Sequence, residues 1–481
     1  MAALPQAPLT TSPTRSFSPP DLRHQVVIVG GGSAGISVAA RLHRRWREVD
    51  IAVIEPSEQH YYQPLWTLVG AGEVPKERTV RPEGSVIPNG VTWIQEAVVG
   101  FEPTQNQVRT SSGRRVGYDF LVVAPGIQID WAAVRGLPDT LGRDGVSSNW
   151  SYETADKTWD YIRNFKGGTA VFTLPNTPVK CPGAAQKIMY LADDHFRRSG
   201  VREKSRVIFA SAAAGIFGVE KYARTLRAVL QRKGIETFFK HNLVEIHPDS
   251  REAVFEQLDS GERLVIAYDL LHVTPPQSAP DVVKQSPLAD KSGWVEVDRH
   301  SLQSPRWPNV FALGDASNLP TAKTGAAVRH QAWVVVDNLV AALQQRDRGS
   351  RYDGYPACPL VTGYGRLVMA EFDYELRPRE TFPFDQSKER YSMYLLKKHG
   401  LPLLYWQGML RGELSRAEKL GKQERQIKED KCGEFLMTNS KIANSKPMRF
   451  AATPDAPLRR RQGSSLAPSV TWERAGKRSH V

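Results

Sequence analysis

A glycine-rich turn between a strand and a helix constrains this chain more than any other feature. The apolar run Val26–Val29 is typical of a buried strand, and an apolar stretch from Ile36 indicates a helix. Glycines spaced G-x-G-x-x-G between them permit a tight turn, close approach of a pyrophosphate and close packing of the helix on the strand. The free N–H groups of the helix N-terminus favour the phosphates. The residues predicted to form this phosphate site are Gly30, Gly32, Ser33, Ala34 and Gly35.

An acidic residue stands where such a site needs one. The second apolar run, Ile51–Ile54, is followed directly by Glu55. An acid at this distance from the glycine turn is placed to bind the ribose hydroxyls of an adenosine. An ordinary glycine-rich turn is the alternative, but the order strand, helix, strand and acid favours a dinucleotide-binding domain.

Size and composition narrow the class of protein. A chain of 481 residues with 41% hydrophobic and 24% charged residues is typical of a soluble protein with two or three domains. Three cysteines exclude a disulfide scaffold, and we expect no metal site. Residues 411–481 hold 16 Lys and Arg against 8 Asp and Glu, so the net charge of +13 is concentrated there. This distribution favours a solvated basic tail or attraction to an anionic membrane surface over nucleic-acid binding.

The alternation of apolar strand-like and helix-like segments indicates how the chain is divided into domains. We expect an α/β fold with two Rossmann-like dinucleotide-binding domains and an aromatic C-terminal region. The predicted segments are a disordered N-terminus (1–23), the first domain in two parts (24–150 and 291–360), a second Rossmann-like domain (151–290), a C-terminal quinone or membrane region (361–412) and a basic, disordered tail (413–481).

Two cysteines stand in proline-rich surroundings. Cys181 precedes a predicted helix and has Lys180 and Lys187 near it in sequence, and both features stabilise a thiolate. Cys358 is also followed by proline, whereas Cys432 lies in the polar tail. No C-x-x-C adjoins the first helix, which excludes a thioredoxin-reductase arrangement. A small buried hydrophobic residue is the alternative for any single cysteine.

A second glycine loop is altered. In Arg206–Gly218 the early glycines are replaced by Ser211 and Ala213. Side chains at these positions keep a pyrophosphate away from the backbone. We therefore expect the second domain to keep its fold without binding a nicotinamide dinucleotide.

Two further strands end in glycine turns, Tyr118–Gly126 and Val310–Ala316, and the second carries Asp315 at its tip. With the first glycine turn, these resemble the flavoprotein disulfide reductases, in which this Asp contacts the flavin's ribityl chain. A turn or helix cap is the alternative for Asp315. Segments 172–191, 358–374 and 380–395 resemble more specifically the sulfide:quinone oxidoreductases, in the branch that includes the mitochondrial enzymes, and this resemblance covers residues 24–412.

The resemblance implies a cofactor, partners and a location. It implies FAD, sulfide and quinone as substrates, a sulfur acceptor such as sulfite or glutathione, and a peripheral place on a bacterial cytoplasmic or mitochondrial inner membrane. Family flavin contacts fall on the first glycine turn and on Glu55, Gln63, Asp315, Lys323, Thr324, Gly325 and Ala326. Lys323 is expected to stabilise the reduced flavin, with a surface lysine as the alternative.

The redox cysteines of the branch fall on Cys181 and Cys358. By resemblance, they are joined at rest, directly or through an extra sulfur. Hydrosulfide attacks Cys358 and leaves a persulfide there, and the Cys181 thiolate passes electrons to FAD. A type II NADH:quinone oxidoreductase and a non-catalytic flavin-binding docking protein are the alternatives. The apolar run Leu401–Leu410 is expected either to enter the membrane interface or to pack on the flavin domain.

Overall fold

The computed structural model describes residues 19–347 and 349–413. Residues 1–18 and 414–481, which make up most of the two terminal segments set apart above, lie outside the described residues. The first strand begins at Leu22, inside the segment whose composition predicts disorder. The domain boundaries drawn from the sequence stay a prediction.

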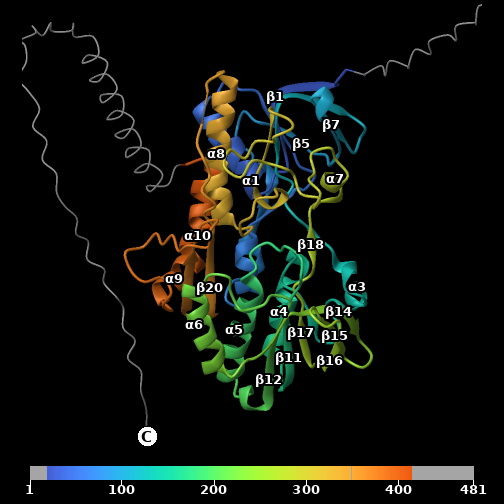
Figure 1. The fold of residues 1–481 in the computed structure, drawn as a ribbon, viewed down its shortest axis with the longest axis vertical. Coiled ribbons are helices and arrows are strands. Elements are labelled where there is room, and N and C mark those ends of the chain that lie inside the picture. Colours follow the sequence, from blue (N-terminus) through green and yellow to red (C-terminus); the bar gives the residue numbers. More distant parts are fainter. Residues whose placement is uncertain (1–18, 348, 414–481) are drawn as a thin grey trace, which may run out of the picture. The chain divides into compact units, whose positions relative to one another are not determined.

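The first sheet gathers the N-terminal strands and one strand from much later in the chain (Figure 1). In spatial order its strands are β5 (Thr92–Ile94), β2 (Ile51–Ile54), β1 (Leu22–Val29), β8 (Arg115–Val123), β7 (Gln107–Thr110) and β6 (Val98–Glu102), and β19 (Val310–Ala312) pairs with β8. Strand β1 is parallel to β2 and β8. Its apolar half, Val26–Val29, is buried throughout, as expected for a parallel strand covered on both faces.

Two long helices belong to this first sheet. Helix α1 (Ser33–Arg45) follows β1 directly, and α8 (Gly325–Leu343) packs against α1. Helix α1 begins three residues before the predicted Ile36, because the glycine turn already has helical backbone from Ser33. The strand β19 and helix α8 return the chain to the first sheet, so this sheet and its helices come from two separate parts of the sequence.

The second sheet is parallel throughout and lies below the first in Figure 1. In spatial order its strands are β10 (Val146–Ser147), β17 (Leu270–His272), β11 (Gly168–Leu174), β12 (Ser205–Ser211) and β13 (Glu236–Phe239). Its helices are α4 (Tyr152–Asn164), α5 (Ala184–Arg198) and α6 (Glu220–Lys233). The two sheets confirm the predicted α/β fold with two Rossmann-like domains. An antiparallel sheet of β14 (His241–His247), β15 (Glu252–Gln257) and β16 (Arg263–Ala267) was not predicted.

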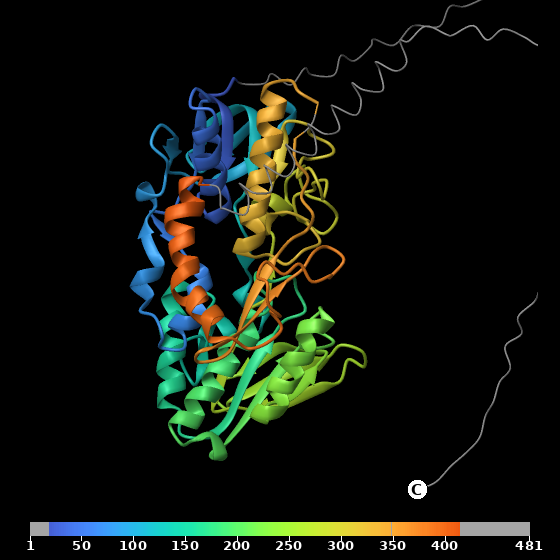
Figure 2. The same cartoon turned by 90° about the vertical axis from the view of Figure 1, so that its left-hand side faces the viewer.

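The C-terminal region consists of a hairpin and a helical run. The hairpin strands are β20 (Ala357–Gly363) and β21 (Arg366–Glu371), and β20 packs against α5. The helical run, residues 391–411, comprises α9 (Tyr391–Leu395), a π-helical turn (Leu396–Gly400), α10 (Leu401–Leu403), a second π-helical turn (Leu404–Gly408) and a 3-10 turn (Met409–Arg411). Figure 2 shows this run beside α1.

Short elements connect these parts. They are β3 (Gln59–Tyr61), β4 (Val80–Pro82), β9 (Gln128–Ile129), β18 (Gln277–Ser278), α2 (Trp66–Val69), α3 (Leu137–Thr140) and α7 (Asp281–Lys284), with 3-10 turns that include Gln63–Leu65, Glu83–Ser85 and Gly314–Ala316. No helix within residues 19–413 has the length and apolar character of a membrane span.

Candidate active site

The structure brings the two predicted redox cysteines together from different domains. Cys181 lies in the loop between β11 and α5, and Cys358 lies on β20. Both are free thiols, and their Sγ atoms are 3.9 Å apart. Cys358 is buried and Cys181 is partly exposed. A disulfide has an S–S bond of about 2.05 Å, so a small movement of one side chain suffices to join them.

The Cys181 loop is fixed by backbone contacts to the other domain. The N–H of Cys181 donates to the carbonyl of Lys323 over 2.8 Å, and Lys180 and Lys323 form an isolated parallel bridge. The carbonyl of Cys181 accepts from the N–H of Ala184, the first residue of α5, over 2.7 Å. Cys181 has a φ of +47°, a left-handed conformation that costs a non-glycine residue about 1–3 kcal/mol. The loop therefore holds the Cys181 sulfur in place at the expense of backbone strain.

Two buried lysines flank the cysteine pair. The Nζ atom of Lys187 donates to Cys181 Sγ over 3.1 Å, and the Lys187 side chain is only 2% exposed. Lys397, from the helical run, is also buried, and its Nζ atom donates to the carbonyl of Pro64 over 2.9 Å. Burial and the nearby Lys187 charge lower the pKa of Lys397 to about 7. The cysteine pair is thus placed in a positive environment.

This environment makes the two thiols unequal. A hydrogen bond from Cys358, followed by the Lys187 charge, holds the pKa of Cys181 well below its usual range. The pKa of Cys358 is raised well above its usual range, because it faces the Cys181 thiolate and is buried. In the reduced pair, Cys181 is therefore the thiolate and Cys358 the thiol.

The first glycine turn has the geometry of a phosphate cradle. Gly30 has a φ of +101°, and a Cβ atom there would lie 2.4 Å from the carbonyl oxygen of Ala124. A Cβ atom at Gly35 would lie 1.8 Å from the carbonyl oxygen of Gly30, whereas one at Gly32 would enter open space. The first turn of α1 carries no acidic side chain and no side-chain cap. The N–H groups of this turn are therefore free for an anionic ligand.

Glu55 supports the turn from the side. Its Oε2 atom accepts from the N–H of Gly31 over 2.7 Å, and its Oε1 atom accepts from the N–H of Ser57 over 2.8 Å. The carboxylate therefore lies beside the glycine turn, at the carboxyl end of β2. A contact with a ribose stays a prediction.

Asp315 has the surroundings of a ligand-binding carboxylate. It lies in the 3-10 turn after β19 and is half-buried, and among the described residues no donor reaches its carboxylate. Burial raises its pKa, while Lys180 and Lys323 oppose that rise. Within the described chain, Asp315 is thus a half-buried carboxylate to which no hydrogen-bond donor is bound, as expected for a residue that binds flavin hydroxyls.

Lys323 is held by its own loop. Its Nζ atom donates to the carbonyls of Asp315 and Ser317 over 2.8 and 2.9 Å and lies 3.9 Å from the centre of the Trp294 ring. Burial lowers its pKa to about 8. These contacts fix the ammonium group on backbone carbonyls, so direct stabilisation of reduced flavin by Lys323 stays a prediction.

The N-terminus of α8 follows Lys323. The Thr324 hydroxyl accepts from the N–H of Ala327 over 3.2 Å and caps the helix, whose first residues are Gly325 and Ala326. Gln63, at the start of a 3-10 turn, is half-buried. The cradle at α1, the free Asp315 carboxylate and the N-terminus of α8 together fit an extended flavin dinucleotide.

In the second dinucleotide loop, a side chain of the loop itself binds one of the backbone N–H groups. The Ser211 hydroxyl accepts from the N–H of Ala213 over 3.2 Å, and the carbonyl of Ala213 accepts from Lys240. The loop also borders a cleft of about 720 Å³, lined among others by Val179, Pro182, Ala213, Trp294, Lys323 and Phe372. The cleft borders the Cys181 loop at Val179 and Pro182.

Two kinds of site residue were missed from the sequence. Lys397 is buried, like Met393 and Tyr394, which lie four and three residues before it. That spacing was the available signal, because residues three and four apart lie on the same face of a helix. Buried hydrogen bonds that join Tyr405 to distant residues had no signal in the sequence. No group of three or more potential metal ligands occurs within residues 19–413.

Comparison with known proteins places the chain in a family. Residues 24–159 match the pyridine nucleotide-disulphide oxidoreductase family model. The mitochondrial sulfide:quinone oxidoreductase of Mus musculus is 50% identical over 390 residues, which cover 81% of this chain and 87% of that protein. The corresponding protein of Dictyostelium discoideum is 46% identical, with coverage of 81% and 86%.

A solved structure supports the fold. The sulfide:quinone oxidoreductase of Aquifex aeolicus matches with a TM-score of 0.70 at 19% identity, covering 82% of this chain and 94% of that chain. On the identity and coverage of the mouse and Dictyostelium relatives, this chain belongs to the sulfide:quinone oxidoreductase family.

Proposed function

We propose that this protein oxidises sulfide at the Cys181–Cys358 pair and passes two electrons through FAD to a quinone. The observation that carries the proposal is the cysteine pair itself, with sulfurs 3.9 Å apart and the Lys187 ammonium 3.1 Å from Cys181. A binding protein has no use for two such unequal thiols. The same arrangement disfavours the alternative of a non-catalytic flavin-binding docking protein.

The reaction begins with the two cysteines joined. Hydrosulfide attacks the Cys358 sulfur, the bond between the two cysteines breaks, and a persulfide forms on Cys358 while Cys181 leaves as a thiolate. Lys187 stabilises that leaving thiolate, and exchange is faster when the leaving thiol has the lower pKa. If an extra sulfur bridges the pair, the attack releases the same Cys181 group with that sulfur attached.

FAD, when bound, accepts two electrons from the Cys181 side and passes them to a quinone. The glycine turn, Glu55 and Asp315 bind the cofactor, and the Cys181 loop is tied to the Lys323 loop at the start of α8. A sulfur acceptor such as sulfite or glutathione takes the outer sulfur from Cys358, and the freed Cys358 sulfur forms its bond to Cys181 again, which releases the two electrons that bound FAD would accept. The cleft beside Val179 and Pro182 is the route for that acceptor.

Nicotinamide is not the electron donor in this proposal. The type II NADH:quinone oxidoreductase alternative needs free N–H groups in the second dinucleotide loop. The N–H of Ala213 is bound to the Ser211 hydroxyl, and side chains replace both early glycines. Rapid bleaching of the flavin by NADH would favour that alternative.

The protein is proposed to work on a membrane surface, where quinones reside. The helical run exposes Leu403 and Leu404, which are 65% and 40% exposed, while Tyr405, Trp406, Met409 and Leu410 are buried. In this proposal, Leu403 and Leu404 contact the membrane interface, whereas Tyr405, Trp406, Met409 and Leu410 pack inside the protein. The mitochondrial relatives favour the inner mitochondrial membrane, and a bacterial cytoplasmic membrane is the alternative.

Anaerobic mixing with sulfide tests the proposal. The flavin of the holoprotein should bleach without NADH and regain its absorbance on addition of a short-chain quinone. Cys181→Ser and Cys358→Ser should each lose the reaction while FAD stays bound, because removal of a nucleophile costs orders of magnitude. Turnover above roughly 10% of the parent rate in both variants contradicts the assignment.

A further inference from the structure

A buried chain of hydrogen bonds connects the helical run to the glycine turn. The hydroxyl of Tyr405 lies 2.7 Å from Ser33 Oγ and 2.6 Å from His60 Nε2. The other ring nitrogen of His60, Nδ1, lies 3.1 Å from Glu83 Oε2. Four residues from the N-terminus of α1, β3, the Glu83–Ser85 turn and the second π-helical turn thus form one line of contacts.

The inner end of this chain is sealed from water. Glu83 is 1% exposed and His60 2% exposed. The second carboxyl oxygen of Glu83 is buried without a hydrogen-bond partner in the described structure. It also faces the glycine turn, since a Cβ atom on Gly31 would lie 2.6 Å from it. A buried, half-satisfied acid costs free energy, so its retention needs a reason beyond packing.

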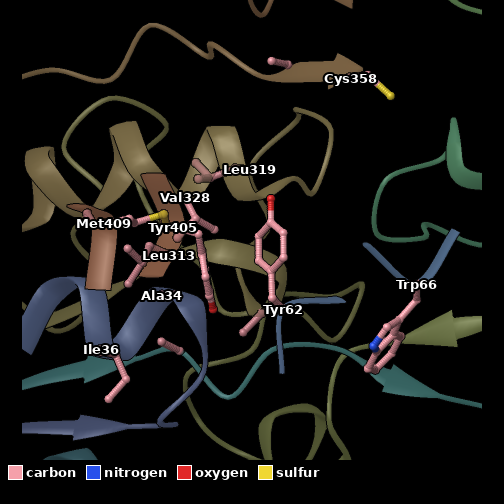
Figure 3. Close-up of a cluster of buried hydrophobic side chains, with 14 of the residues drawn as sticks. Ala34, Ile36, Tyr62, Trp66, Leu313, Leu319, Val328, Cys358, Tyr405 and Met409 are labelled. Atoms are coloured by element: carbon pink, nitrogen blue, oxygen red, sulfur yellow. The ribbon is translucent and has the colours of Figure 1, made fainter. Parts of the chain in front are cut away.

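The aromatic surroundings fix the position of Tyr405. Its ring centre lies 4.5 Å from that of Tyr62 and 5.0 Å from that of Trp406. Figure 3 shows Tyr405 beside Tyr62, with Val328 and Leu313 close by. The hydroxyl therefore has little freedom to leave the line between His60 and Ser33.

The protonation of Glu83 determines in which direction the hydrogen bonds from Glu83 to Ser33 are donated. When Glu83 is protonated, its O–H donates to His60 Nδ1, the Nε2–H of the ring donates to the Tyr405 oxygen, and the Tyr405 O–H donates to Ser33 Oγ. The hydroxyl proton of Ser33 is then free for an acceptor outside the chain. When Glu83 is ionised, His60 Nδ1–H donates to it, Nε2 accepts from the Tyr405 hydroxyl, and Tyr405 accepts from Ser33, so the Ser33 proton is used internally.

The surroundings of Glu83 favour the arrangement in which the hydrogen bonds are donated from Glu83 toward Ser33. Burial raises the pKa of Glu83, the nearby Glu55 carboxylate raises it further, and the hydrogen bond from His60 opposes the rise. Around the pair, the facing groups are Glu55 at the end of β2, Tyr405 on the helical run and Ser33 at the start of α1. A phosphate at the glycine turn adds negative charge and favours retention of the proton.

We propose that Tyr405, His60 and Glu83 are positioning residues that turn the Ser33 hydroxyl outward, as a donor to the pyrophosphate of the bound dinucleotide. The proposal rests on FAD binding at the first glycine turn. It adds that residues of the helical run, remote in sequence from the turn, determine how tightly the pyrophosphate is held.

Release of FAD from the holoprotein tests the proposal without reference to turnover. Tyr405→Phe keeps the ring and removes only the hydroxyl, and we expect it to raise the FAD dissociation constant about 10-fold, the loss expected for one hydrogen bond to a charged group. Glu83→Gln should stay within about twofold of the parent, because its amide still donates toward His60. Tyr118→Phe is the control, since Tyr118 is a buried tyrosine of the same domain whose hydroxyl has no partner in the described structure.

A double-mutant cycle separates positioning from packing. In a Ser33→Ala background, Tyr405→Phe should cost no further affinity, because the group through which it acts is gone. The proposal is overturned if Tyr405→Phe leaves the dissociation constant unchanged, or if it lowers affinity equally with and without Ser33. FAD dissociation is measured without sulfide or quinone, so failure of this proposal is distinguishable from failure of the proposed activity.

Discussion

Replacing Lys187 with methionine is the sharpest test of how the cysteine site works. The substitution keeps an unbranched side chain, one atom shorter, while it removes the ammonium group 3.1 Å from Cys181 Sγ. A hydrogen bond to a charged group contributes about 1.5–3 kcal/mol, which corresponds to a factor of about 10–100 in the equilibrium that forms the thiolate. We therefore expect flavin reduction by sulfide at neutral pH to slow by about that factor.

The pH profile gives the sign of the effect. The pKa of Cys181 lies below its usual range, so its thiolate is present above that pKa and is lost as the pH falls through it. Without the ammonium the pKa rises, and the acidic limb of the profile moves to higher pH. The variant should accordingly approach the parent rate in alkaline buffer, since the thiolate then forms without help.

Stopped-flow bleaching of the flavin by sulfide, measured across a pH series, is the appropriate assay. Lys187→Arg, which keeps the charge, is the matched control and should retain the parent profile. FAD content and circular dichroism should be unchanged in both variants. A Lys187→Met profile that superimposes on the parent profile would refute the role of this lysine.

Three further outcomes follow from the same geometry. Because Cys181 has a φ of +47°, Cys181→Gly should be more stable to chemical denaturation than Cys181→Ala by about 1 kcal/mol, and equal stability would show that the loop relaxes. Glu55→Ala should weaken FAD binding by about 1–3 kcal/mol, because the Gly31 N–H loses its acceptor, and unchanged flavin retention on dialysis would contradict this. NADH and NADPH should leave the flavin absorbance unchanged over the time in which sulfide bleaches it, since Ser211 occupies the second loop.

Local patterns in the sequence were enough to predict the two Rossmann-like sheets. Strand β2 has the predicted bounds Ile51–Ile54, and the predicted run Val26–Val29 is the buried half of β1. Parallel strands are apolar on both faces, so their runs stand out from the helices around them. The hairpin of β20 and β21 was missed, because β20 combines cysteine, proline and glycine with apolar residues, and neither strand shows a clear alternation of apolar and polar residues.

The site was predictable only in part, for a physical reason. Sequence similarity to the family indicated both cysteines, but nothing local to Cys181 or Cys358 gives the 3.9 Å between them. Their approach depends on β20 packing against α5, a contact between segments far apart in the chain. Lys397 and Tyr405 come from the helical run by the same kind of long-range packing, and a short apolar window gives no information about which partner lies opposite.

The bond between Ser33 and Tyr405 joins residues 372 positions apart, and this separation affects how the protein is made. A ribosome adds about 5–20 residues per second, so the glycine turn waits roughly 20–75 seconds for its last partner. Until then His60 and Glu83 lack the tyrosine that seals them. A chain that stops short of the helical run therefore keeps a complete cofactor fingerprint with an unsealed polar interior. A copy truncated before the helical run should therefore be cleaved by a protease faster than the full chain, because the Tyr405 ring no longer covers His60.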